Sequence, residues 1–158
     1  MTLLDAKEYN PKPRQRLMRL IGIVIVVAIV AWVAWFIFRY QPEKNVMDKF
    51  FQAIEAGKFE DAYGIYNADP NWKQHPDKYS GYPYNQFVLD WGPSGDYGRI
   101  TQHNVECATE PPARGFKSPT GVIVVVKINN RTDKTESFWV EKKTKTIGYP
   151  APQRAVCQ

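Results

Sequence analysis

The most constraining feature of this 158-residue chain is an apolar stretch, residues 20–38, that contains no charged residue and lies between Arg19 and Arg39. As an α-helix rising about 1.5 Å per residue, it spans about 28 Å, close to the hydrocarbon thickness of a bilayer. A single span in lipid must satisfy every backbone N–H within its own segment, which only a helix allows. We therefore predict one transmembrane helix over residues 19–40.

The residues around this helix predict its orientation. Lys and Arg are more numerous before the helix than just after it, which favours a cytoplasmic N-terminus. Aromatic side chains that suit a headgroup boundary gather at its C-terminal end: Trp32, Trp35, Phe36, Phe38 and Tyr40. A cleaved signal peptide is the alternative, but its apolar region is usually shorter and ends in small residues. We predict an uncleaved, single-pass signal-anchor.

The predicted topology gives the chain three parts. Residues 1–18 form a basic cytoplasmic tail, and residues 41–158 form one extracytoplasmic domain, in the periplasm if the anchor lies in a bacterial inner membrane. The formal net charge is +5, and the segment 1–19 alone holds five basic and two acidic residues. This charge suits topology and contact with anionic membrane lipid. No basic stripe with interleaved aromatics follows the helix, so we expect no nucleic-acid partner.

Cys107 and Cys157 both lie on the predicted outer side of the membrane. An even number of cysteines in an oxidising compartment favours a disulfide. Such a bond closes a loop of about fifty residues and restrains the C-terminus. The alternative is two unpaired thiols, one buried and one in a loose tail.

Periodicity in residues 41–158 predicts helices first and strands afterwards. Apolar residues at three- and four-residue spacing predict amphipathic helices at 43–56 and 59–66, separated by Gly57, and a shorter helix at 83–91. Strands are predicted at 100–108, 121–129, 136–142 and 144–149, and the second is apolar on both faces at its start, as in a central strand. The fold class is α+β, with a helical hairpin packed on a curved antiparallel sheet of three to four strands.

The segment Phe-Phe-Gln-Ala-Ile-Glu-Ala-Gly-Lys-Phe-Glu-Asp-Ala-Tyr at 50–63, followed by the terminal meander of strands, resembles the nuclear transport factor 2-like superfamily. This cone-shaped α+β fold is also called cystatin-like in its broader grouping. The resemblance covers residues 44–150. It implies an exported bacterial domain behind a single membrane helix, a plan that periplasmic scaffolds of transport and secretion machines also use.

The segment 67–98 is rich in aromatic residues and is the candidate binding region. Trp and Tyr give large contact areas at low entropic cost, so we predict partner binding through Trp72, Tyr79, Tyr82 and Tyr84. The alternative is that such rings fill the open end of the cone. We favour that alternative for Phe87 and Trp91.

Catalytic and metal-binding patterns are weak in this chain. Asp90 beside Trp91 is the most enzyme-like group, because aromatic walls can raise the pKa of a carboxyl group. It also suits a simple helix end, and we assign no catalytic residue. His103 and Cys107, on one strand, lie about 13 Å apart, too far to share an ion. We expect no metal site and no cofactor.

These observations lead to two functional hypotheses. In the first, the protein is a non-enzymatic accessory or scaffold subunit that binds other subunits of a membrane complex through its extracytoplasmic domain. In the second, the cone is hollow and binds a small apolar ligand, as a carrier or as a weak enzyme acting through Asp90. A filled core with an exposed aromatic patch favours the first hypothesis, and a large empty cavity favours the second.

Overall fold

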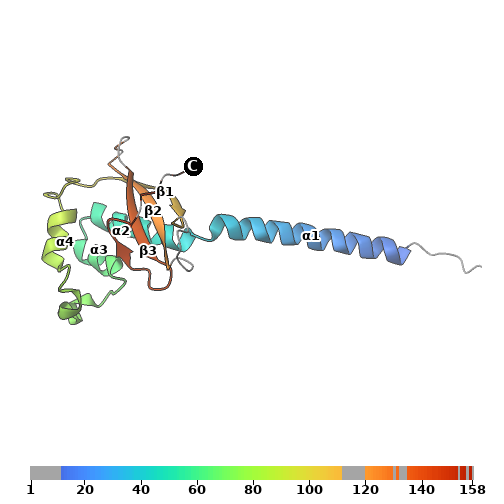
Figure 1. Ribbon diagram of the computed structural model, residues 1–158, viewed down its shortest axis with the longest axis horizontal. Helices are drawn as coiled ribbons and strands as arrows, with labels where there is room; N and C mark the ends of the chain where they lie inside the picture. Colours follow the sequence, from blue (N-terminus) through green and yellow to red (C-terminus); the bar gives the residue numbers. More distant parts are fainter. Residues whose placement is uncertain are drawn as a thin grey trace, which may run out of the picture. The chain divides into compact units, whose positions relative to one another are not determined.

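The computed structural model describes residues 12–111, 120–129, 131, 135–152, 154–155 and 157. The chain divides into two compact units, Met1–Arg39 and Tyr40–Gln158 (Figure 1). Residues 1–11 of the predicted tail lie outside the described residues. The described part of the first unit is the helix α1, Lys12–Phe38.

Helix α1 has the character of a membrane segment. Its large apolar side chains from Leu17 to Phe38 are between 42% and 66% exposed, so they are not buried within the helix's own unit as described. Among the described helices, this one is long and apolar enough to cross a bilayer. A signal sequence at the N-terminus has the same properties. The helix is therefore a membrane anchor or a signal sequence.

The second unit begins with three α-helices, α2 (Gln41–Glu55), α3 (Phe59–Tyr66) and α4 (Tyr84–Trp91). Pro42 lies in the first turn of α2, where its missing N–H costs nothing. Gly57 reverses the chain between α2 and α3 with a φ of +71°, a backbone conformation that favours glycine. Two short 3₁₀ helices, η1 (Trp72–Gln74) and η2 (Pro76–Tyr79), lie between α3 and α4 in the aromatic-rich segment.

Four strands then form one antiparallel sheet in the order β1-β2-β3-β4. The strands are β1 (His103–Thr109), β2 (Gly121–Ile128), β3 (Thr135–Glu141) and β4 (Ile147–Gly148). The central place predicted for the second strand is confirmed. The α+β order of helices followed by an antiparallel sheet is confirmed too, and the sheet is not strongly curled.

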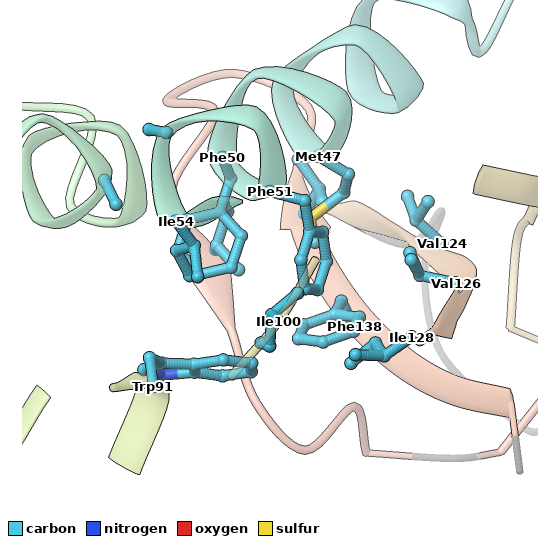
Figure 2. Close-up of a cluster of buried hydrophobic side chains, with 14 of the residues drawn as sticks. Met47, Phe50, Phe51, Ile54, Trp91, Ile100, Val124, Val126, Ile128 and Phe138 are labelled. Carbon is cyan, nitrogen blue, oxygen red and sulfur yellow. The ribbon is translucent and has the colours of Figure 1, made fainter. Parts of the chain in front are cut away.

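The core fills the space between the helices and one face of the sheet (Figure 2). Phe50 and Phe51 of α2 point toward the sheet and are fully buried, as is Phe138 of β3. The ring of Phe51 meets that of Phe138 edge to face, with centroids 5.5 Å apart. Trp91 closes the cluster, with its ring 5.4 Å from that of Phe50. Large aromatic side chains thus occupy the interior of the domain.

The opposite face of the sheet is also covered. Val125 of β2 points away from the core cluster, yet its side chain is fully buried. Its register neighbours are Cys107 on β1 and Ser137 on β3. The C-terminal segment is attached to both of them: Ala155 N donates to Ser137 Oγ at 3.4 Å, and Cys157 forms a disulfide with Cys107. Ala155 and Cys157 therefore lie against the sheet at the level of Val125.

We expect the disulfide to hold this segment on the sheet. Replacing Cys107 and Cys157 with serine opens a loop of 50 residues. Chain entropy then predicts a loss of about 4 kcal/mol in the free energy of unfolding. The release of the segment also exposes the face around Val125, which increases the binding of a hydrophobic dye. Both are measured on the detergent-extracted protein, by chemical denaturation and by dye fluorescence.

The control is treatment with a reductant, which should destabilise the natural chain and leave the serine variant unchanged. Equal stability of the two proteins, with no added dye binding, contradicts a restraining role for the bond.

Candidate functional site

A surface cleft of about 330 Å³ lies where α4 ends and the following turn meets the C-terminal part of the domain. We call it the acidic cleft and define it by its lining residues: Tyr82, Leu89, Asp90, Trp91, Ser94, Gly95, Asp96, Tyr97 and Tyr149. Two of these residues are acidic and none is Lys or Arg. The cleft therefore carries negative charge between aromatic walls.

Two close backbone approaches shape this cleft. At Gly92, a Cβ would lie 2.4 Å from the carbonyl oxygen of Val88, and at Gly95 it would lie 2.0 Å from that of Asp90. Only glycine allows the chain to fold back so tightly against the end of α4. The turn thereby brings Asp96 to the same cleft as Asp90.

The two carboxylates differ in how they are held. Asp90 accepts hydrogen bonds from Tyr82 Oη at 2.8 Å and from Gln86 Nε2 at 2.7 Å, one on each oxygen. Asp96 is exposed and forms no hydrogen bond or ion pair with the described residues. Asp90 is thus an oriented acceptor, and Asp96 is an unpaired negative charge.

Three aromatic rings build the opposite wall. Trp91 stacks on Tyr97, with centroids 5.7 Å apart and an interplanar angle of 12°, and meets Tyr149 edge to face at 5.5 Å. The hydroxyl groups of Tyr97 and Tyr149 lie 2.5 Å apart, and Tyr149 Oη donates to Glu136 Oε2 at 3.1 Å. Because the hydrogen of Tyr149 is used on Glu136, Tyr97 is the donor to Tyr149.

The surroundings keep the cleft tyrosines neutral. Burial raises the pKa of Tyr82, and the nearby carboxylate of Asp90 raises it further. Burial likewise raises the pKa of Tyr97, with the contact to Tyr149 as the second cause. Their hydroxyl groups therefore remain hydrogen-bond donors well above neutral pH.

The cleft also carries exposed apolar surface. Leu89 is 57% exposed and Tyr149 is 38% exposed. Among the described residues of the second unit, these are the exposed large apolar side chains, and both line the acidic cleft. Both side chains are therefore open to contact with a partner.

The structure divides the four aromatic residues predicted to bind a partner. The rings of Trp72, Tyr79 and Tyr84 surround the buried ring of Tyr63, at 4.7, 6.1 and 5.4 Å between centroids. Tyr82 lines the acidic cleft instead. All four are half-buried against the core. One side of each ring thus has a packing role, and their role in binding stays a prediction.

Leu89, Asp96 and Tyr149 were not predicted as site residues from the sequence. Tyr149 lies 52 residues after Tyr97 in the sequence, and the hydroxyl groups of the two residues meet. No local sequence pattern could therefore place Tyr149 in the cleft. The close approach of the turn at Gly95 to the backbone of Asp90 also left no signal in the local sequence. An apolar Leu89 beside an acidic residue at a helix end was the one available signal.

A larger groove of about 630 Å³ lies along α2 and α3 and includes Trp72. Among its lining residues, Lys73 binds Glu60 at 2.6 Å, and Lys145 binds Glu43, a buried residue outside the lining. Acidic and basic residues both line the groove, so its charge does not clearly favour either a cationic or an anionic ligand. We therefore regard the acidic cleft as the better candidate site.

The residues considered for metal binding have other partners. His103 Nδ1 lies 2.7 Å from Glu55 Oε1, and His103 Nε2 lies 3.0 Å from Asp48 Oδ1. The ring also stacks on Phe51 at 5.2 Å, which ties β1 to α2. Cys107 is in the disulfide. Across the described ranges, no three His, Cys, Asp or Glu side chains are placed to hold one metal ion.

No protein-family model, curated protein or solved structure matches this chain. The resemblance to the nuclear transport factor 2-like superfamily is supported at the level of element order alone, helices followed by a four-stranded antiparallel sheet.

The raised pKa values of Tyr82 and Tyr97 predict how stability depends on alkaline pH. In the unfolded chain both phenols ionise near their ordinary pKa of 10.0. The folded state holds their protons to higher pH, so their contribution to stability is complete below about pH 10 and falls as the pH rises above it. Tyrosinate absorbance at about 295 nm should therefore appear for these residues together with the loss of near-ultraviolet circular dichroism.

In the double variant Tyr82→Phe with Tyr97→Phe, the tyrosinate absorbance that appears in this cooperative step should be smaller by the signal of two tyrosines. Ionisation of both phenols near pH 10 in a protein that stays folded contradicts the assignment.

Proposed function

We propose that this chain is a single-pass, membrane-anchored accessory or scaffold protein. Helix α1 acts as an uncleaved anchor in the bacterial inner membrane, with residues 1–18 in the cytoplasm and residues 41–158 outside it. The exposed apolar side chains of α1 support a place in lipid. A disulfide between Cys107 and Cys157 suits an oxidising compartment. In this proposal the domain belongs to the nuclear transport factor 2-like group, and its binding role is non-enzymatic.

The observation that carries the binding role is the exposed apolar surface of the acidic cleft. Leu89 and Tyr149 come from distant parts of the sequence and remain exposed at the same place. Burying them against another subunit gains free energy, at about 25 cal/mol per Å² of apolar area. We infer that another subunit of a membrane complex covers this cleft.

The packing of the interior supports a surface site over a site inside a hollow cone. Phe50, Phe51 and Phe138 are fully buried, and Phe51 contacts both of the others. They occupy the space that an apolar ligand would need. Anchoring in the same membrane raises the effective concentration of the partner. A modest contact area is then sufficient for binding.

The anchor is tested on the protein extracted from its native membrane. An uncleaved helix α1 predicts that mass spectrometry finds the intact N-terminal segment and that alkaline carbonate does not release the protein. Protease added outside the cytoplasmic membrane should digest the domain and spare the tail. A soluble protein whose N-terminus lies beyond residue 38 indicates a cleaved signal peptide and contradicts this part of the proposal.

The binding role is tested by gentle detergent extraction and affinity purification of the full chain. The natural protein should bring down a membrane complex in stoichiometric amount. Leu89→Asp places a charge on the contact surface, and we expect the affinity for the partner to fall at least about tenfold, because a lost leucine contact costs about 1.5–3 kcal/mol. Leu89 is 57% exposed, so the fold should tolerate the change.

The matched control is Gln74→Asp, which adds the same charge at an exposed position that lines neither the acidic cleft nor the larger groove. It should retain the partner. Purification of the natural protein alone, or equal loss in both variants, argues against binding at the cleft.

A further inference from the structure

The hydrogen-bonding groups of the acidic cleft indicate what it recognises. Tyr82 uses its hydroxyl hydrogen on Asp90, Tyr149 uses its own on Glu136, and Tyr97 therefore donates to Tyr149. The tyrosine hydrogens are thus used within the protein. The charged groups left to a ligand are the carboxylates of Asp90 and Asp96, which only accept hydrogen bonds, so the cleft favours a ligand that donates them.

The carboxylates add charge to this pattern. An ionised carboxyl group has about four acceptor positions. Asp90 uses two of them, on Tyr82 and Gln86, so its oriented oxygens can accept further bonds. Asp96 forms no hydrogen bond or ion pair with the described residues and remains fully available. A positively charged N–H donor satisfies both groups, and such charge-assisted bonds are stronger than neutral ones.

The aromatic walls suit the same ligand. The faces of tyrosine and tryptophan rings attract cations, Arg more often than Lys. Tyr82, Tyr97 and Tyr149 line the cleft beside the carboxylates, and no basic residue among the lining residues competes for them. A guanidinium or ammonium group is therefore favoured by the rings, by the charge and by the acceptors together.

Leu89 indicates that the cation belongs to a protein segment. A small free cation seated between Asp90 and Asp96 would leave this 57% exposed side chain in water. A partner chain with an apolar residue next to its basic residue covers both. We propose that the acidic cleft binds an Arg or Lys side chain of a partner segment, with an apolar neighbour packed on Leu89. This inference rests on the proposed function, whose partner it describes.

The test uses a defined probe, the peptide Leu-Arg-Leu-amide with a fluorophore in amide linkage at its N-terminus, and the full chain in a non-ionic detergent. Fluorescence anisotropy measures its affinity. The peptide with citrulline in place of arginine has nearly the same shape without the charge, and we expect about tenfold weaker binding, within the range for charge-assisted hydrogen bonds. A peptide with glycine in place of both leucines should also bind more weakly, because it leaves Leu89 uncovered.

Variants assign the binding to the cleft. Asp90→Asn with Asp96→Asn should weaken binding of the arginine peptide about tenfold. Asp96→Asn alone should weaken it too, and this change disturbs no hydrogen bond or ion pair among the described residues. The matched control, Asp61→Asn with Asp77→Asn, removes the same charge at exposed positions outside the cleft and should leave affinity unchanged.

Three results would overturn the inference: equal affinity for the arginine and citrulline peptides, equal weakening in the cleft and control variants, or no loss on removing the leucines. The proposed function can fail separately. A membrane complex that is lost with Leu89→Asp but retained with both cleft aspartates replaced overturns the cation site and leaves the binding role. Specific peptide binding without any co-purified complex supports the cation site and counts against the accessory role.

Discussion

Packing around Trp91 joins the core of the domain to its candidate site. The indole is 3% exposed and contacts Phe50 and Phe138 in the interior, with centroids 5.4 and 5.8 Å away. It also stacks on Tyr97 and meets Tyr149, which line the acidic cleft. The position of the cleft wall is therefore set by the same close packing that stabilises the fold. A binding surface supported in this way loses little conformational entropy when a partner arrives.

Local sequence pattern was sufficient for the elements and insufficient for the site. The helical spacing of α2 and the apolar run of β2 depend on neighbours a few residues apart, so both could be predicted. The contact between Tyr97 and Tyr149 and the pairing of His103 with Asp48 join residues about fifty positions apart. Such contacts depend on tertiary packing, which periodicity does not encode. The predicted aromatic region includes Tyr82, which lines the cleft, but it did not identify the partners that complete the cleft.

The sheet illustrates the same limit on a larger scale. The sequence showed that β2 is apolar on both faces, and a strand of this kind needs cover on both sides. The helices supply it on one face. On the other, the cover includes a C-terminal segment bonded to Ser137 and joined by a disulfide to Cys107. The need for a second cover followed from β2 itself, whereas the segment that supplies it could be located only in three dimensions.

The proposed anchor and the proposed cation site depend on each other energetically. A single exposed charged contact contributes about 1 kcal/mol or less, because water screens it and side-chain entropy opposes it. The rings beside Asp90 and Asp96 strengthen the contact, yet the cleft, at about 330 Å³, is small. Free in solution, such a site would bind too weakly to keep a partner. Held in the same membrane as its partner, the domain meets it at a high effective concentration, and a weak, charge-selective contact is then enough to choose the partner and the orientation in which it binds.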